Sequence, residues 1–435
     1  MSKTLMPENP FSESHRTSEE VVLSSMPTNT VAKESFYRKI VMGLLSKMNA
    51  GKLNITFPSG EVRSLGNGEG GITANVKIND ERFFKRCVLY GDVGFGEAYM
   101  QGEWDTDSIT NVIKWFLLNV DNAPGVSGSS AQSWVTNLLK GLNTLRHLGR
   151  ANTLSGSKKN ISEHYDLHND FFALFLDPSM TYSSAYFKNP EMSLEQAQYE
   201  KYERLCQQMH LKSTDHVLEI GSGWGGNAIY MASKYGCKVT TVTISEEQHK
   251  FAKERIAKLN LADKIDVRIQ DYRKITGKFD KIVSVEMLEA VGAEYFESYF
   301  RKCQELLKKD GILAFQVITC PDSRFEQLRT GVDWIQKHIF PGSLLPSVAA
   351  LNDAINKTGD LTLVDLKDLG LHYARTLATW YKNFNAHLPE VKALGFDDMF
   401  IRKWDYYLCY CEAAFAMRNI NVMQMVYARP NNTIR

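Results

Sequence analysis

The residues best suited to chemistry lie at 217–226, where Val-Leu-Glu-Ile runs into Gly-Ser-Gly-Trp-Gly-Gly. Glycine permits positive φ angles and lets a ligand approach the backbone closely. The next residues, 227–235, have a helical pattern, and a helix N-terminus offers unpaired N–H groups and a positive dipole end. A second strand-like run, Val239–Thr243, ends in Ile-Ser-Glu-Glu-Gln. Together these segments predict a strand–loop–helix–strand crossover that binds a nucleotide-type cofactor.

The glycine loop lacks the Gly-Lys-Ser/Thr ending of a P-loop, so a phosphate-cradling role has little support. Its pattern is similar to the first motif of class I S-adenosylmethionine-dependent methyltransferases. In that superfamily the loop passes under the methionine part of the cofactor, and the end of the next strand meets the ribose.

Strand-like and helix-like segments alternate from residue 161 onward, which predicts a doubly wound α/β fold with a mostly parallel sheet. The predicted strands are 217–220, 239–242, 265–269, 281–285, 312–318 and 422–428. Residues 322–360 interrupt the rhythm and are interpreted as an insertion over the active site. Residues 371–429 are expected to form a long helix and the final strand. The expected catalytic unit is a seven-stranded Rossmann-like methyltransferase sheet with a helical insertion.

At 435 residues the chain exceeds one average domain. Residues 1–34 are polar, rich in Ser, Glu and Pro, and are predicted to be a disordered tail. Residues 35–121 combine a helical pattern at 35–48 with strand-like pieces at 53–57 and 72–78, which predicts a small α+β N-terminal domain. The catalytic domain is expected to span 161–435.

A linker region, 122–160, is predicted between the two domains. It begins with a stretch rich in Gly, Ser and Pro and continues with apolar residues at helical spacing. Residues 122–162 carry five basic side chains and no acidic one: Lys140, Arg146, Arg150, Lys158 and Lys159. Such a segment can lie on an anionic membrane surface, or its apolar face can dock on the main domain, and both interpretations remain open.

Composition excludes several classes of protein. The formal net charge is +1, so there is no global attraction to nucleic acid. Seven cysteines without a Cys-x-x-Cys pair argue against a structural zinc site and a disulfide framework. No run of 18 apolar residues and no apolar signal core occur, which favours a cytoplasmic protein without a spanning helix.

Further motifs make the resemblance specific. They are His-Tyr-Asp-Leu-His-Asn-Asp-Phe-Phe at 164–172, Met-Thr-Tyr-Ser-Ser-Ala-Tyr-Phe at 180–187 and Glu-Met-Leu-Glu-Ala-Val-Gly at 286–292. With the glycine loop, they strongly resemble the cyclopropane-fatty-acid synthase family, which includes mycolic acid cyclopropane synthases and methyltransferases. Residues 94–104 also resemble the N-terminal domain of phospholipid-acting members.

The resemblance implies a set of S-adenosylmethionine contacts. Tyr182 and Ser183 correspond to the pair at the methionine end, and Thr243 and Gln248 to the ribose contacts. Asp271 follows the next strand, where the superfamily meets the adenine, although a helix-capping role explains it equally well. The predicted cofactor residues are Tyr182, Ser183, Glu219, Gly221, Gly223, Thr243, Gln248, Asp271 and Tyr272.

The family reaction begins when the π electrons of a cis alkene attack the sulfonium methyl, which leaves a carbocation on the acyl chain. A base then removes a proton. Loss from the new methyl closes a cyclopropane, whereas the same loss after a hydride shift from the neighbouring chain carbon leaves a methylene branch. The pocket must be dry and tolerant of cations, and candidate aromatic faces are Tyr186, Phe187, Trp334, Phe340, Tyr373 and Trp380.

In characterised members of the family the base is a bicarbonate ion. Glu289 and Tyr373 match its ligands, and Ile318 matches the backbone contact. Ser184 replaces the family cysteine and Gln316 the family histidine. These neutral groups can still hydrogen-bond an anion, so a partial dependence on bicarbonate is expected. The replacements resemble a subgroup that includes bacterial methylene-forming enzymes.

The favoured function is cyclopropane formation on unsaturated phospholipid acyl chains in a bilayer, by an enzyme peripheral to the inner membrane surface and compatible with a homodimer. The alternative product is a methylene-branched chain, which would also call for a partner reductase. An amine N-methyltransferase is less favoured, because a soluble amine needs neither the N-terminal domain nor the basic linker. A non-catalytic lipid-binding protein is disfavoured by the intact glycine loop.

Overall fold

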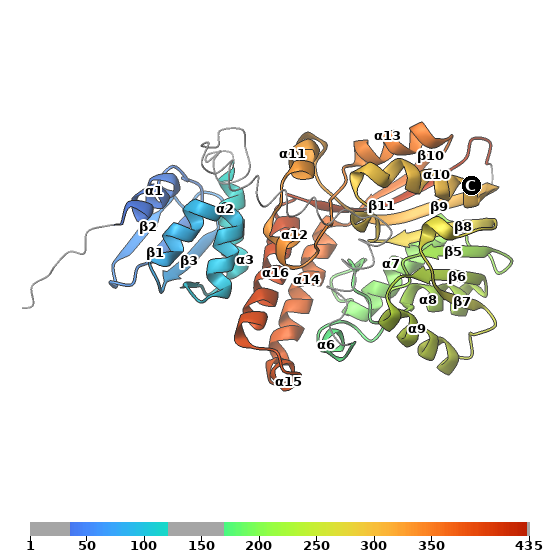
Figure 1. Cartoon of the computed structure of the whole chain (residues 1–435), viewed down its shortest axis with the longest axis horizontal. Coiled ribbons are helices and arrows are strands. Elements are labelled where there is room, and N and C mark those ends of the chain that lie inside the picture. The colour runs from blue at the N-terminus through green and yellow to red at the C-terminus, as the bar shows by residue number, and fades with distance from the viewer. Residues whose placement is uncertain (1–34, 121–168, 433–435) are drawn as a thin grey trace, which may run out of the picture. The chain divides into compact units, whose positions relative to one another are not determined.

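The computed structural model describes residues 35–120 and 169–432. The predicted tail at 1–34 and the whole of the predicted basic linker at 122–160 lie outside these residues. The proposed domain boundaries therefore stay predictions. Two sheets organise the described residues, one of four strands and one of seven (Figure 1). Within the described stretches, no helix has both the length and the apolar character needed to cross a membrane.

The four-stranded sheet has the order β2-β1-β3-β4. Its strands are β1 (Lys52–Thr56), β2 (Val62–Leu65), β3 (Thr73–Ile78) and β4 (Trp104–Asp105). β1 pairs antiparallel with β2 and parallel with β3. Exposed and buried side chains alternate along β3, as expected for a sheet with one face on a core and the other toward water. The strands predicted at 53–57 and 72–78 are present within one residue, whereas the sequence pattern does not indicate β2.

Three helices accompany this sheet: α1 (Phe36–Leu45), α2 (Arg82–Met100) and α3 (Ile109–Leu118). α2 is interrupted at Gly91, whose φ of 58° and ψ of −133° are not helical. Beyond this break, Phe95 packs on Trp104 with ring centroids 4.5 Å apart. Tyr99 and Trp104 are buried, so these aromatic residues belong to the core.

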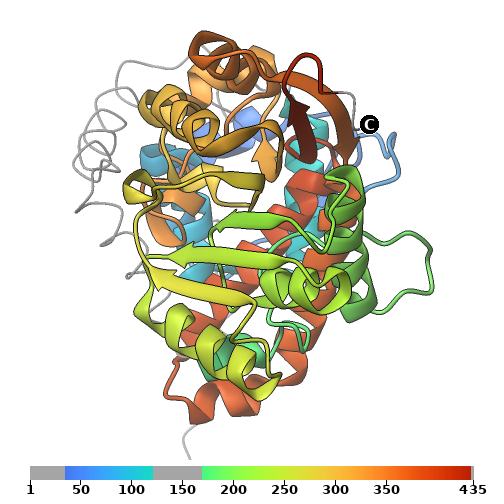
Figure 2. The ribbon, with the colours of Figure 1, turned by 90° about the vertical axis from the view of Figure 1, so that its right-hand side faces the viewer.

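The seven-stranded sheet confirms the predicted fold class (Figure 2). Its order is β10-β11-β9-β8-β5-β6-β7, and β11 runs antiparallel to both of its neighbours. The strands are β5 (His216–Ile220), β6 (Lys238–Thr243), β7 (Ile265–Ile269), β8 (Phe279–Val285), β9 (Leu307–Thr319), β10 (Thr362–Asp368) and β11 (Asn421–Ala428). Six correspond to predicted strands, and β10 is the seventh, which the sequence pattern does not locate.

Helices cover both faces of this sheet, so it is doubly wound. Adjacent residues of β5 belong to different apolar cores: Val217 packs with residues of α7, α8 and α9, and Leu218 with residues of α10 and α13. These helices are α7 (Leu194–Gln208), α8 (Gly226–Tyr235), α9 (Glu246–Lys258), α10 (Phe296–Leu306) and α13 (Val348–Thr358). The short helix α6 (Asn169–Ala173) precedes them.

The predicted insertion at 322–360 is too long. It contains α11 (Phe325–Thr330) and α12 (Trp334–His338), but α13 packs on α10 and belongs to the sheet layer. The predicted single long helix after residue 371 is also wrong. Three helices occur instead: α14 (Gly370–Ala386), α15 (Leu388–Ala393) and α16 (Asp398–Ala416). The helix is divided because a proline ring and a left-handed glycine both break a helix. Pro389 lies in the first turn of α15, and Gly395, with φ 92°, lies between α15 and α16.

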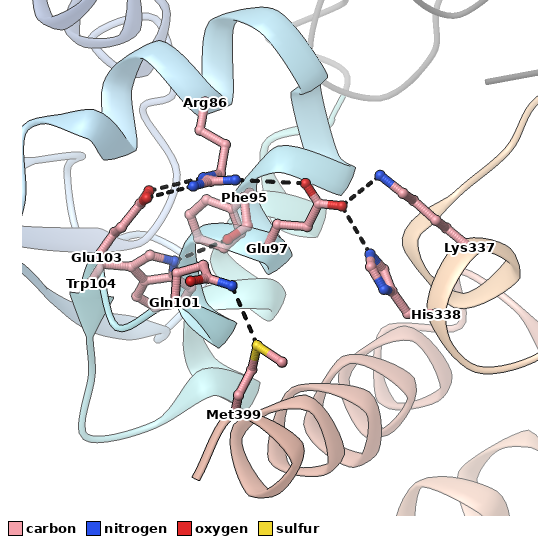
Figure 3. A network of polar contacts seen from close by, with 9 residues as sticks. All are labelled: Arg86, Phe95, Glu97, Gln101, Glu103, Trp104, Lys337, His338 and Met399. Carbon is pink, nitrogen blue, oxygen red and sulfur yellow. Dashed lines mark hydrogen bonds and ion pairs between the residues drawn. The ribbon is translucent and has the colours of Figure 1, made fainter. Parts of the chain in front are cut away.

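Polar side chains of α2 meet α12 in a network that Figure 3 shows. Glu97 lies 2.6 Å from Lys337 Nζ and 3.0 Å from His338 Nε2. Arg86 donates two hydrogen bonds to Glu103, at 3.0 and 2.7 Å, and lies 3.9 Å from Glu97. Burial opposes ionisation of Glu97, but hydrogen bonds from His338 and Lys337 outweigh it and lower its pKa to about 2. We call these five residues the α2 network.

Candidate functional site

A cavity of about 1250 Å³ opens at the carboxyl ends of β5, β6 and β8, which is where ligands bind in open α/β sheets. Twelve of the fourteen predicted site residues line it: Tyr182, Ser183, Glu219, Gly221, Gly223, Thr243, Gln248, Asp271, Tyr272, Glu289, Ile318 and Tyr373. The other two, Ser184 and Gln316, are buried behind its wall.

The same cavity continues into an apolar region beside α1, α2 and α3. Its wall there includes Val41, Leu44, Phe83, Phe95, Phe116 and Leu117. One end of the cavity is therefore formed by backbone and polar groups, and the other by aliphatic and aromatic side chains.

The glycine loop provides the close approach that its sequence predicts. Gly221 and Gly223 have φ angles of 97° and 48°. A Cβ built on Gly223 would have no described atom within 4 Å, so this glycine faces open space in the cavity. The N-terminus of α8 follows directly, at Gly226. Loop and helix end therefore fit a cofactor that needs backbone contact along one edge.

Glu219 braces this loop from the end of β5. Its two carboxylate oxygens accept hydrogen bonds from Asn227 Nδ2 at 2.8 Å and Thr241 Oγ1 at 2.6 Å. Burial raises the pKa of Glu219 to about 7, although both hydrogen bonds oppose the rise. Its side chain is thus tied to α8 and β6.

Two further segments form the side of the cavity predicted to meet ribose and adenine. Thr243 Oγ1 donates to Gln248 Oε1 at 2.9 Å, which joins the end of β6 to the first turn of α9. Asp271 caps the turn at 272–274 and pairs with Arg273 at 2.6 Å. Burial works against ionisation of Asp271, but Arg273 outweighs it and lowers the pKa. The Asp271 carboxylate is therefore engaged as a cap, and Tyr272 lines the cavity beside it.

Helix α7 holds the predicted methionine-end pair. Lys201 Nζ donates to Ser183 Oγ at 2.6 Å, and Gln198 Nε2 donates to the Ser183 carbonyl at 3.0 Å. The Tyr182 hydroxyl donates to Tyr407 at 2.9 Å. Lys201 is fully buried, and burial lowers its pKa to about 7 against the opposing charges of Glu286 and Asp177.

Glu286 is the central acidic group that the sequence analysis does not assign to the site. It follows β8 with a φ of 48°, a strained backbone for a residue with a side chain. Its Oε1 accepts hydrogen bonds from the Ser184 N–H at 2.9 Å and from Gln316 Nε2 at 2.7 Å. Burial raises its pKa, whereas Lys201, Gln316, Ser184 and a hydrogen bond from Tyr373 lower it in part.

Glu289 lies one turn further, in the short helix at 288–290. Its Oε1 accepts a hydrogen bond from the Ile318 N–H at 2.5 Å, and its Oε2 is buried without a partner among the described residues. Burial, followed by the negative charge of Glu286, raises its pKa to about 8. We call Glu286 and Glu289 the carboxylate pair.

The four groups predicted to hold bicarbonate beside Glu289 do not fit that ion. The Ser184 N–H, Gln316 amide and Tyr373 hydroxyl already serve Glu286, and the Ile318 N–H serves Glu289. The Ser184 hydroxyl donates to the Ala185 carbonyl at 3.1 Å. An added anion would also meet the Glu286 carboxylate, a repulsive arrangement.

Sequence reasoning missed Glu286 and Lys201 for different reasons. Glu286 ends a predicted parallel strand, so its position alone is a usable signal. Lys201 is a lysine in an otherwise polar helix, and nothing local marks it as buried. Of the aromatic candidates, Phe340 and Tyr373 line the cavity, whereas Tyr186, Phe187, Trp334 and Trp380 do not.

Comparison with known proteins agrees with this geometry. Residues 153–425 match the family model described as mycolic acid cyclopropane synthetase. A tuberculostearic acid methyltransferase of Mycobacterium tuberculosis is 37% identical over 79% of this chain and 81% of its own. The cyclopropane-fatty-acyl-phospholipid synthase of Escherichia coli K12 is 37% identical over 83% and 89%. A crystal structure of a mycolic acid cyclopropane synthase with S-adenosylhomocysteine and CTAB is 28% identical with a TM-score of 0.58, over 62% and 98%.

Proposed function

This chain belongs to the mycolic acid cyclopropane synthetase family and is an S-adenosylmethionine-dependent methyltransferase of lipids, and we propose that its reaction is cyclopropanation. Its substrate would be the cis double bond of an unsaturated phospholipid acyl chain. The proposal extends to this chain what the name of the E. coli relative states for that protein.

The observation that carries the proposal is the continuity of the cavity. It joins the glycine loop at Gly221 and Gly223 to apolar side chains of α1, α2 and α3, such as Leu44 and Phe116. A long hydrocarbon chain gains free energy by leaving water for such a wall, about 25 cal/mol per Å² of apolar surface. A small polar substrate would not fill this apolar part of the cavity or gain free energy from its wall.

Residues of the polar end would hold and orient the cofactor. The backbone of Gly221 and Gly223 would give close approach, Tyr182 and Ser183 would hold the methionine end, and Thr243 with Gln248 would contact the ribose. Tyr272 would contact the adenine. When bound, S-adenosylmethionine supplies the electrophilic methyl group.

The wall near the carboxylate pair would govern the positive charge on the acyl chain. Tyr373 and Phe340 line the cavity there, and aromatic faces stabilise cations. Their bulk also excludes water, which would otherwise trap the cation as an alcohol.

A methylene-branched chain is the second candidate product, with a partner reductase as a further requirement. It is supported by the relative named for tuberculostearic acid, whose 37% identity equals that of the relative named for cyclopropane formation. The neutral residues Ser184 and Gln316 support it as well. An amine N-methyltransferase is not favoured, because a soluble amine needs no apolar cavity beside α1.

We further propose that the enzyme works at the inner membrane surface, where phospholipid is presented. The basic residues between 122 and 160 support this placement through attraction to anionic lipid. A homodimer is compatible with the proposal but carries no part of it.

Incubation with S-adenosylmethionine and vesicles of an unsaturated phospholipid, followed by NMR of the released acyl chains, tests the function. Cyclopropane protons appear upfield and vinylidene protons downfield, although both products gain the same mass. Gly223→Val is the negative control, because a branched Cβ occupies the cavity and opposes the positive φ. Unmodified acyl chains with the wild-type protein would refute the function.

A further inference from the structure

The groups predicted to hold a bicarbonate base instead surround a side chain of the protein. Glu286 Oε1 receives the Ser184 N–H and the Gln316 amide, with Tyr373 as a further hydrogen-bond partner. Glu286 also lines the cavity. A carboxylate thus already occupies the anion position and faces the space where the acyl chain would lie.

An oriented chain of side chains ends at this carboxylate. Arg204 Nη1 donates to Gln424 Oε1 at 2.9 Å, Gln424 Nε2 donates to Gln316 Oε1 at 3.0 Å, and Gln316 Nε2 donates to Glu286. Gln316 and Gln424 are directly opposite each other on β9 and β11, so pairing of these strands sets their contact. Asp365 holds Arg204 at 2.5 Å.

The direction of this chain follows from chemistry. A guanidinium has donors only, so Gln424 must present its oxygen to Arg204 and its NH₂ to Gln316. Gln316 must then present its own NH₂ to Glu286. A group that receives N–H donors from two sides is best served by an ionised carboxylate.

We propose that Glu286 is the proton acceptor of the reaction, in place of a bound bicarbonate ion, and that Arg204, Gln424 and Gln316 position it. This inference rests on the proposed function. After methylation, a C–H bond of the new methyl group breaks, and the proton passes to the Glu286 carboxylate. The electron pair of that bond closes the ring onto the cationic carbon. If a 1,2-hydride shift has first moved the positive charge to the methylated carbon, the same electron pair forms the double bond of the methylene branch instead. Solvent takes that proton after the product leaves.

Glu289 is not the proton acceptor in this proposal. Its Oε2 is buried without a partner among the described residues and its Oε1 is held by Ile318. Two carboxyl groups in one site separate into a protonated and an ionised member, and Lys201 acts on Glu286. Glu289 is therefore the protonated member.

Chemical rescue tests the base. Glu286→Gly suits the positive φ and empties the anion position, so kcat should fall about 100-fold or more, while S-adenosylmethionine affinity by calorimetry stays within a factor of about two. Bicarbonate or formate should then restore part of the lost activity. Glu286→Gln, which fills the position with a neutral amide, should lose activity without rescue. Wild-type activity should not change when bicarbonate is removed.

Wild-type turnover that collapses without bicarbonate, or a Glu286→Gly variant that keeps full activity in its absence, would overturn the proposal. Either result leaves the proposed function intact, because product is still formed. Absence of any methylated acyl chain with the wild-type protein would refute the function itself.

Gln424→Glu tests the positioning chain. The introduced carboxylate keeps Arg204 as its partner but attracts the Gln316 NH₂, which turns the Gln316 oxygen toward Glu286. Ionised Glu286 is then disfavoured, so the acidic limb of the kcat profile should move to higher pH, with kcat near pH 7 reduced about tenfold and the KM for cofactor unchanged. Gln304→Glu is the matched control, because Gln304 is also a buried glutamine but bonds Thr358 away from the cavity. An identical pH profile in Gln424→Glu and wild type would refute the positioning role.

Discussion

The α2 network and the carboxylate pair each contain two glutamates, but they differ in their positive partners. Arg86 and Lys337 bring positive charge to the glutamates of the α2 network, His338 lies within hydrogen-bonding distance of Glu97, and the pKa of Glu97 falls to about 2. Within residues 35–120 and 169–432, Lys201 is the one cation that acts on Glu286 of the carboxylate pair, where the hydrogen-bond donors are amides and a hydroxyl. The pKa of Glu289 rises to about 8. In these two regions, nearby cations accompany the glutamate whose pKa is lowered, and burial without a direct cationic partner accompanies the glutamate whose pKa is raised.

Their positions in the fold reinforce this difference. The α2 network joins α2 to α12 through side chains that bind one another. Glu97 contacts Lys337 and His338, and Glu103 contacts Arg86. The carboxylate pair follows the end of β8, on strained backbone at Glu286, and faces the cavity. Strain and incomplete charge compensation are typical of functional sites, whose energetic cost is offset elsewhere in the fold.

The largest expected contrast is catalytic. Glu286→Gln should lower kcat by about 10² to 10⁴, or about 3 to 5 kcal/mol in the barrier. Glu97→Gln should leave kcat within a factor of about two, because Glu97 touches α12 and not the cavity. Turnover of both variants on phospholipid vesicles measures this contrast. Similar losses in the two variants would erase the distinction between the regions.

The next effect is on stability. Glu103→Gln should lower the free energy of unfolding by about 3 kcal/mol, because Arg86 loses two charge-assisted hydrogen bonds to a carboxylate that is almost fully buried. Glu286→Gln should lower it far less, since its strained, partly compensated position contributes little. Urea unfolding monitored by circular dichroism gives both values. A greater loss in Glu286→Gln would make that residue a structural anchor.

The pH dependence of stability should also differ. Folded Glu289 keeps its proton up to about pH 8, whereas the unfolded chain loses it near 4.5. The folded state therefore binds more protons in this window, and the free energy of unfolding falls as pH rises from about 5 to 8. Glu289→Gln should remove about 4 kcal/mol of this decline, and part of the remaining slope comes from Glu219, whose pKa is about 7, and from Asp333 and Asp405, whose pKa values are about 6. Thermal melts at several pH values test this, and equal slopes in variant and wild type would contradict it.

The smallest effect concerns Lys337. Lys337→Gln should cost about 0.5 to 1 kcal/mol at pH 7, because its ammonium is one-third exposed and water screens the pair. The pKa of Glu97 is lowered, so the contribution is present above pH 4.5 and disappears as pH falls toward about 2. Comparing melts of variant and wild type across this range measures it. A difference that persists at pH 2 would place the effect of Lys337 outside its ion pair.

Much of the fold and part of the site follow from local sequence. The run from Val217 to Gly226 combines apolar strand-forming residues with glycines, and the structure has a buried strand followed by a turn of positive-φ glycines there. Alternation of strands and helices similarly predicts the doubly wound sheet. β10 escaped prediction because it pairs with β11, a strand distant in sequence, and its own residues are a mixture of polar and apolar types.

The sequence by itself determined the sheet, the glycine loop and the candidate cofactor residues, because these depend on periodicity, glycine and strand ends. Only the tertiary structure decided the chemistry of the acidic centre. Pairing of β9 with β11 aligned Gln316 with Gln424, and packing of α7 buried Lys201 near Glu286. Residues more than 80 positions apart thereby control one carboxylate. Burial and charge in such a centre are sums over neighbours that no local pattern contains, so the role of Glu286 emerged only from the folded chain.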